Sequence, residues 1–194
     1  MSYVVAVDVG IKNLGLCVYD PYYRKFIHWE TTSLVPVGRY IPAMNVQYVR
    51  DFVQRYYRYF ENAAVVLVER QMRCNMRIIE SVLQSMFYNR CLVISPRSVK
   101  AHFGLSMKNY RENKERAVAW AHTFVEQHKP AFFSPEELGF HLAKKKDDFA
   151  DSLLLVVYYI DTYSNPTVTA SPLHAVDAEP TGGPHGDERL VRRP

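Results

Sequence analysis

The sequence predicts an α/β fold: a mixed sheet, with three antiparallel strands followed by parallel strands, and helices on both of its faces. Apolar, strand-like runs separated by short turns crowd roughly the first 30 residues, as in an antiparallel meander. Beyond residue 44, segments with apolar residues at helical spacing alternate with short β-branched runs. Because such alternation is typical of parallel strands joined by helices, the two patterns together favour a mixed sheet.

The three N-terminal strands are expected over residues 3–9, 16–19 and 24–30. The first run is mostly valine, a composition typical of a buried strand. Gly10 and Gly15 mark the turn that follows it, and Asp20-Pro21 marks the next turn. Prolines and a glycine make residues 31–43 irregular.

Helices and strands then alternate to the end of the folded part. Apolar residues at helical spacing predict helices over 45–61, 72–89, 112–128 and 147–161, with a helical turn over 97–103. Short apolar runs predict strands over 63–68 and 92–94, and Ser95-Pro96 ends the second of them. A break in the pattern is expected from Pro130 to Pro135.

Residues 1–163 are predicted to form one domain, because the ordered pattern stops there. Residues 164–194 are rich in proline and glycine, hold little to bury, and are expected to be a disordered tail. The whole chain carries a formal net charge of +4, and the tail has four acids against three arginines, which leaves +5 on the domain. If acids of the domain hold metal ions, the remaining surface is basic enough to suit a partner rich in phosphate.

Composition argues against several other classes of protein. The 194 residues are 48% hydrophobic and 23% charged, which fits a globular chain with a substantial core. No membrane association is expected, because the longest apolar run, Leu153 to Ile160, contains two tyrosines, and no signal peptide is visible. The three cysteines are scattered and form no metal-ligand pair, which favours free thiols in a reducing, intracellular compartment.

Four acidic residues lie in or beside apolar runs. Asp8 lies in the first strand-like run, and Glu69 follows the run at 63–68. Asp148 and Asp151 are three residues apart, so a helix would bring them to one face. Burying one carboxylate alone costs several kcal/mol, and converging carboxylates repel one another. Two divalent metal ions about 4 Å apart remove that repulsion and are widely used for phosphodiester hydrolysis.

Each of these acids also has an ordinary structural interpretation. Asp8 begins the pattern DxGxxxxG, which also describes a hairpin with a surface aspartate, although its glycines permit a tight hairpin and a close approach of backbone to a phosphate or metal. Glu69 could begin the following helix, where the helix dipole favours an acid. Asp148 and Asp151 could be N-terminal helix acids preceded by three solvated lysines.

Five segments together resemble the RuvC-like Holliday junction resolvases, and most closely their poxvirus-type branch. The resemblance extends over residues 3–163, nearly the whole predicted domain. The order and spacing of the five segments agree with the family, which is far more specific than any one segment. The segments are DxGxxxxG at Asp8, the strand-end Glu69, Ser95-Pro96-Arg97-Ser98-Val99-Lys100, residues 112–118 and residues 145–153.

The resemblance implies an RNase H-like fold and a homodimer whose subunits meet at helix 72–89. It also implies metal-dependent cleavage of four-way DNA junctions, with two Mg²⁺ ions for which Mn²⁺ can substitute. In-line attack by water would give paired symmetric nicks with 5′-phosphate ends. A poxvirus-type enzyme would act where viral DNA is replicated in the host cell. The residues that fall on the family's catalytic, metal-binding acids are Asp8, Glu69, Asp148 and Asp151.

Basic residues supply the candidate contacts to DNA phosphates. Lys100 and Lys114 fall where bacterial members of the family have DNA-binding lysines. Further candidates are Arg70, Arg73, Arg77 and Arg97. Met72 stands where bacterial members carry an aromatic residue that opens bases, so the resemblance does not extend to that function.

Three other functions are compatible with parts of this pattern. Another RNase H-like nuclease, acting on RNA–DNA hybrids, flaps or other branches, would use the same acids, and a substrate panel would separate it. A phosphotransferase of the actin and sugar-kinase type also uses DxGxxxxG, but it needs a second domain and a second glycine-rich phosphate loop. A non-catalytic binder of branched DNA would be indicated by loss of one acid, and all four are present.

Overall fold

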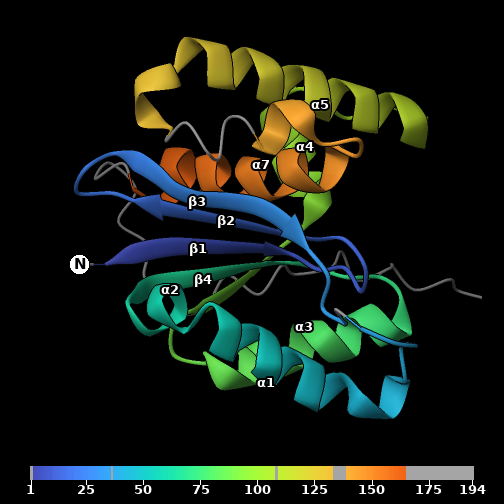
Figure 1. The fold of residues 1–194 in the computed structure, drawn as a ribbon. Coiled ribbons are helices and arrows are strands. Elements are labelled where there is room, and N and C mark those ends of the chain that lie inside the picture. Colours follow the sequence, from blue (N-terminus) through green and yellow to red (C-terminus); the bar gives the residue numbers. More distant parts are fainter. Residues whose placement is uncertain (1, 36, 108, 133–138, 165–194) are drawn as a thin grey trace, which may run out of the picture.

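The structure, a computed structural model, describes residues 2–35, 37–107, 109–132 and 139–164. The predicted tail, 164–194, lies outside the described residues except for Ser164. A five-stranded mixed sheet forms the centre of the described part, and helices pack on both of its faces (Figure 1). The α/β architecture predicted from the sequence is therefore confirmed.

The strands of the sheet are β1 (Tyr3–Asp8), β2 (Leu14–Asp20), β3 (Lys25–Thr32), β4 (Ala63–Glu69) and β5 (Cys91–Ile94). Their order is β3-β2-β1-β4-β5. The first three strands pair antiparallel, and β1, β4 and β5 run parallel to one another. Because the neighbours β1 and β4 are parallel and end at Asp8 and Glu69, both acids reach the same edge of the sheet.

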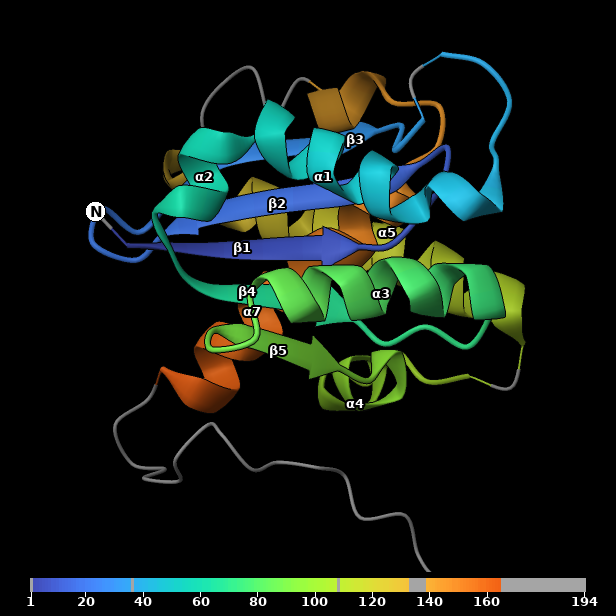
Figure 2. The same ribbon diagram turned by 90° about the horizontal axis from the view of Figure 1, so that it is seen from below.

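The helices form two layers, one on each face of the sheet (Figures 1 and 2). One layer holds α1 (Asn45–Arg55), α2 (Tyr57–Glu61) and α3 (Cys74–Met86); the other holds α4 (Pro96–His102), α5 (Tyr110–Gln127) and α7 (Asp147–Tyr163). Short 3-10 turns lie at Pro42–Met44 and Lys129–Ala131. Alternate residues of β1 enter the two cores: Val5 and Val7 face the α1–α3 layer, whereas Val4 and Ala6 face the other. None of the described helices is both long and apolar enough to cross a bilayer.

The prediction of one continuous helix over 45–61 is wrong, because the segment is divided at Tyr56. This residue leaves helical geometry, with φ −108° and ψ 26°. Its hydroxyl donates a hydrogen bond to the carboxylate of Glu30 on β3. The shorter helix that follows buries Tyr59 and Phe60 in the core beneath it. The break therefore serves tertiary contacts that the spacing of apolar residues along the chain does not reveal.

Helix α7 is the most buried helix of its layer, and its first turns are tied to the sheet. Residues 153–156 are no more than 2% exposed. The indole Nε1 of Trp29, on β3, donates a hydrogen bond of 3.0 Å to the carbonyl oxygen of Phe149. The buried hydroxyl of Ser152 donates to the same carbonyl at 2.9 Å. The Trp29 contact ties the start of α7, which carries two of the predicted site acids, to the sheet, whereas the Ser152 bond lies within the helix.

Candidate active site

A cleft at the carboxyl ends of β1 and β4 contains all four acids predicted from the sequence. Asp8 ends β1, Glu69 ends β4, and Asp148 and Asp151 lie in the first turns of α7. All four side chains line one cleft of about 490 Å³. Three segments that are far apart in the sequence therefore contribute carboxylates to one place.

The acid with the most strongly perturbed surroundings is Asp8, which is only 8% exposed. Burial raises the pKa of its carboxyl well above the ordinary value, and the nearby negative charges of Glu69, Asp151 and Asp148 raise it further. A side-chain hydrogen bond also joins Asp8 to Glu69. The four carboxylates thus act on one another electrostatically, as groups that share one site must.

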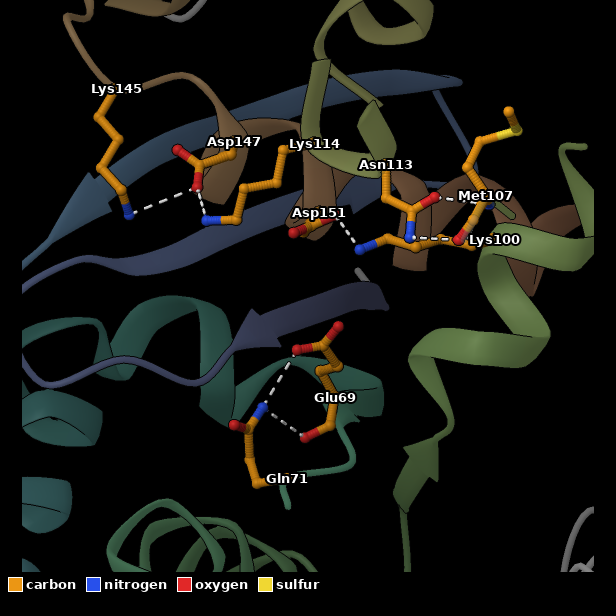
Figure 3. A network of polar contacts seen from close by, with 9 residues as sticks. All are labelled: Glu69, Gln71, Lys100, Met107, Asn113, Lys114, Lys145, Asp147 and Asp151. Carbon is orange, nitrogen blue, oxygen red and sulfur yellow. Dashed lines mark hydrogen bonds and ion pairs between the residues drawn. The ribbon is translucent and has the colours of Figure 1, made fainter. Parts of the chain in front are cut away.

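Gln71 orients the carboxylate of Glu69, a role that the sequence did not predict. Its side-chain Nε2 donates to Glu69 Oε2 at 3.1 Å and to the Glu69 carbonyl oxygen at 3.2 Å (Figure 3). The backbone N of Gln71 donates to Oε2 of the buried Glu80, on α3, at 2.6 Å. The loop after β4 is therefore tied both to the site and to the helix that follows.

Two lysines pair with the two site acids of α7, Asp148 and Asp151. The Nζ of Lys100 lies 3.4 Å from Asp151 Oδ1 (Figure 3), and Lys145 pairs with Asp148. Burial nevertheless raises the pKa of Asp151 to about 6, and the lysine only partly opposes this. Burial also raises the pKa of Asp148, again against the effect of its lysine. Both acids therefore lie in surroundings that favour a further positive charge.

Asp147, the first residue of α7, has a different role from Asp148 and Asp151. Its carboxylate pairs with Lys114 and lies 3.6 Å from the Nζ of Lys145 (Figure 3). Burial raises the pKa of Asp147, but the hydrogen bond from Lys114 and the positive charges of Lys145 and Lys114 together outweigh burial, so the pKa is lowered overall. Asp147 is thus an ionised anchor for two lysines at the rim of the cleft.

The predicted DNA-binding residues line the same cleft as the acids. Arg70 and Arg73 lie on the loop after β4, and Lys100 and Lys114 come from α4 and α5. Lys145 also lines the cleft, which excludes the alternative that all three lysines of residues 144–146 are merely solvated. Its position three residues before Asp148, just ahead of a predicted helix, was the available signal. The other two candidates lie elsewhere: Arg97 lines a neighbouring hollow with Lys100, and Arg77 lines a groove between α1 and α3.

The donor atoms of the cleft suit a hard divalent cation. Carboxylate oxygens are the ligands that Mg²⁺ and Mn²⁺ prefer, and four carboxylates line this cleft. The charges of the other three raise the pKa of Asp8, and a bound cation would relieve this repulsion. Within the described ranges, no three His, Cys, Asp or Glu side chains already stand together as a ready ligand set. Asp148 and Asp151 are instead turned to their lysines, so metal binding would require these two side chains to exchange partners.

The two glycines of DxGxxxxG allow close approaches between segments of the backbone. A Cβ on Gly10 would lie 1.9 Å from the backbone oxygen of Asn13, so the turn needs glycine. Gly15 is the strand partner of Asp8, and a Cβ there would lie 2.3 Å from the backbone oxygen of Asp148. The second glycine thus lets the start of α7 lie directly over the strand pair that ends in Asp8, which brings acids of two elements together.

Replacing Gly15 by alanine is therefore expected to destabilise the fold by about 1–3 kcal/mol, because backbone on both sides of the contact must move apart. Urea unfolding followed by circular dichroism measures this loss. Gly139→Ala is the matched control, because a Cβ at that glycine meets no atom within 4 Å. Equal unfolding midpoints for Gly15→Ala and the unaltered protein would show that the contact is not tight.

Comparison with known proteins identifies the family of this chain. The profile of the family described as Poxvirus A22 protein matches residues 2–162. This chain belongs to the Poxvirus A22 protein family. The match covers nearly the whole predicted domain, and it confirms the poxvirus-type resemblance drawn from the five sequence segments. A search of curated protein sequences found no match.

Solved structures that resemble this A22 family member confirm its fold. The fowlpox virus resolvase in complex with Holliday junction DNA has a TM-score of 0.59 at 22% identity, over 82% of this chain and 97% of the other. The yeast mitochondrial Holliday junction resolvase Ydc2 has a TM-score of 0.62 at 22% identity, over 79% and 77%. RuvC of Thermus thermophilus with a Holliday junction substrate has a TM-score of 0.50 at 16% identity, over 84% and 98%. The expected RNase H-like, RuvC-like architecture is thus confirmed.

Proposed function

We propose that this protein is a metal-dependent endonuclease that resolves four-way DNA junctions by paired, symmetric nicks. One observation carries the proposal: carboxylates from three distant segments line a single cleft with a basic rim, in a chain of the Poxvirus A22 protein family. The fowlpox and T. thermophilus proteins that share its fold were solved with Holliday junction DNA. The family also supports a task in processing replication or recombination intermediates where viral DNA is replicated in a host cell.

The catalytic residues of the proposal are Asp8, Glu69, Asp148 and Asp151, which would together hold two Mg²⁺ ions, or Mn²⁺ in their place. Bound ions would supply the positive charge that activates an attacking water and stabilises the leaving 3′ oxygen, giving a 5′-phosphate and a 3′-hydroxyl. The protein's own groups prepare the site. The ionised carboxylates of Asp8 and Asp151 would be favoured by bound ions against the burial that raises their pKa values, and Gln71 keeps the carboxylate of Glu69 in position.

Basic residues on the rim would hold the phosphates that flank the bond to be cut. Arg70 and Arg73 would contact the strand from the loop after β4, and Lys100 and Lys114 from α4 and α5. Because phosphate contacts release counterions, junction affinity should fall steeply with salt. Selectivity would come from the shape of the junction, since phosphate contacts carry no sequence information.

The experiment that tests this function is incubation with a synthetic four-way junction whose branch point can migrate, with Mg²⁺, with Mn²⁺ and with EDTA. Symmetric nicks on opposing strands, present with either metal and absent with EDTA, are expected. Nicks that DNA ligase reseals would establish the 5′-phosphate product. Preferred cleavage of an RNA–DNA hybrid or a flap would favour another RNase H-like nuclease, and junction binding without any cleavage would favour a non-catalytic binder.

A homodimer is part of the proposal, because two active sites related by a two-fold axis can cut two symmetry-related strands. The proposed contact is the groove between α1 and α3, and its occupant is a second copy of this chain. Val46, Ile78 and Met86 line this groove and are 54%, 45% and 41% exposed, a large apolar surface for one helix pair. This surface lies on the helix that the resemblance assigns to the dimer.

Replacing both Ile78 and Met86 by aspartate is expected to convert the dimer to a monomer, because four charges would be buried at a two-fold contact. Analytical ultracentrifugation measures the change. The monomer should still nick one strand of a junction, but it should no longer nick the two symmetry-related strands together. Gln84→Asp is the control, since Gln84 is exposed on α3 outside the groove. An unaltered protein that is monomeric at micromolar concentration would refute the dimer.

A further inference from the structure

A tyrosine with an exposed ring lies on the wall of the acid cleft. Tyr110 is the first residue of α5, is 71% exposed, and lines the cleft together with the four acids. Met72, which is 82% exposed, lines the same cleft from the loop after β4. A highly charged cleft thus presents two large apolar side chains to its contents. Neither contributes to the core, so a role in folding does not explain them.

The backbone beneath Tyr110 is held rigidly, although its ring is exposed. The side chain of Asn109 caps the helix by accepting a hydrogen bond of 2.9 Å from the backbone N of Arg111. Asn113 joins both backbone groups of Met107, accepting from its N at 2.6 Å and donating to its O at 3.1 Å (Figure 3). The start of α5 that carries the tyrosine is therefore held by side-chain hydrogen bonds, while its ring is open to a flat partner.

Lys114, a proposed phosphate contact, lies beside the same ring. The Nζ of Lys114 is 5.1 Å from the ring centre of Tyr110, and Asp147 holds this lysine from the other side. If Lys114 contacts a backbone phosphate of bound DNA, the base attached to that stretch of backbone comes within reach of the ring. Aromatic rings paired with basic residues along a groove are a common means of binding unpaired strands.

We propose that Tyr110 stacks on a nucleobase of the strand to be cut, close to the phosphate that would lie in the cleft with the four acids. This contact would favour DNA in which a base can leave the helical stack. The inference rests on the proposed junction-cleaving function. Unstacking a base costs least where its pairing is already disturbed, as at a branch point, so the ring favours junctions over continuous duplex. Met72 would supply an apolar contact from the other side of the cleft.

The direct test places the fluorescent base 2-aminopurine at each position around the branch point of a synthetic junction. Binding is measured with Ca²⁺ in place of Mg²⁺ so that cleavage is slow. The unaltered protein is expected to change the fluorescence at one or two positions. Tyr110→Ala should abolish that change and weaken junction binding roughly 5- to 150-fold, which corresponds to about 1–3 kcal/mol of stacking.

Three further variants distinguish stacking from other roles of the tyrosine. Tyr110→Phe should retain the fluorescence change, and Tyr110→Leu should lose it, because only phenylalanine keeps the ring. Lys114→Ala should reduce the salt dependence of binding by about one phosphate contact, whereas Tyr110→Ala should leave that slope unchanged. Tyr22→Ala is the matched control, because Tyr22 is 84% exposed in the turn after β2 and lies outside the cleft.

Failure of this inference and failure of the proposed function give different results. If the unaltered protein cuts junctions but Tyr110→Ala leaves the fluorescence change and the affinity intact, stacking is refuted and the nuclease function stands. If no junction is bound or cut under any metal condition, the function itself is refuted, and the stacking proposal is refuted with it. Thermal unfolding of Tyr110→Ala should match that of the unaltered protein, since the ring is exposed.

Discussion

Asp148→Asn is expected to lower the rate of junction cleavage about 1,000-fold, the usual effect of removing one group that stabilises charge in a transition state. The substitution removes one carboxylate from the set proposed to hold the metal ions. Junction binding should survive, because the rim residues Arg70, Arg73, Lys100 and Lys114 are untouched. Single-turnover cleavage and a gel-shift assay with Ca²⁺ measure the two effects separately.

The control for this prediction is an acid of the same helix that lies outside the cleft. Asp161 is exposed near the end of α7 and pairs with His102. Asp161→Asn should therefore cleave at the unaltered rate. Cleavage by Asp148→Asn within a few-fold of the unaltered rate would remove Asp148 from the catalytic set.

The second large effect concerns stability, and its sign is opposite to that of most substitutions. Asp151→Asn is expected to stabilise the metal-free protein at pH 8 by about 3 kcal/mol, since its folded pKa of about 6 lies some two units above the unfolded value. Folding favours the protonated carboxyl, so this contribution is present below about pH 4 and is lost as pH rises through 6. Asparagine imitates the neutral carboxyl and should avoid the loss.

Urea unfolding in EDTA at several pH values measures this prediction. The difference between Asp151→Asn and the unaltered protein should vanish near pH 4 and be fully developed above pH 7. Adding Mg²⁺ at pH 8 should stabilise the unaltered protein more than the variant, because a bound cation relieves the same repulsion. A variant less stable than the unaltered protein at pH 8 would mean that the ion pair with Lys100 outweighs burial.

Much of the fold and the four acids were predictable because the relevant signals are local. The apolar runs that become β1 and β4 end at Asp8 and Glu69, and parallel pairing of those runs is enough to bring the two acids together. The spacing of Asp148 and Asp151 likewise fixed their shared helix face. These features depend on sequence periodicity and strand direction, both of which can be inferred from the chain alone.

The features that sequence reasoning missed depend on which partner a polar side chain finds in the folded chain. The break at Tyr56 is accompanied by a hydrogen bond to β3, and apolar spacing continues across it. Solvation of Lys146 was one of two interpretations of the lysine run, but its Nζ donates to three nearby backbone carbonyls, those of Phe140, His141 and Ala143. Asp147 and Lys114 are 33 residues apart and still form an ion pair. No short-range pattern predicts such pairings.

The position of α7 has a consequence for the cell that makes this protein. Two of the four proposed catalytic acids lie within the last 17-residue helix of the described part, whereas the other two are contributed by strands synthesised much earlier. A partly translated chain therefore holds only half of the proposed ligand set. A product whose synthesis stops before Asp148 therefore lacks two of the four proposed metal ligands, so the proposed site is complete only when nearly the entire domain has been made.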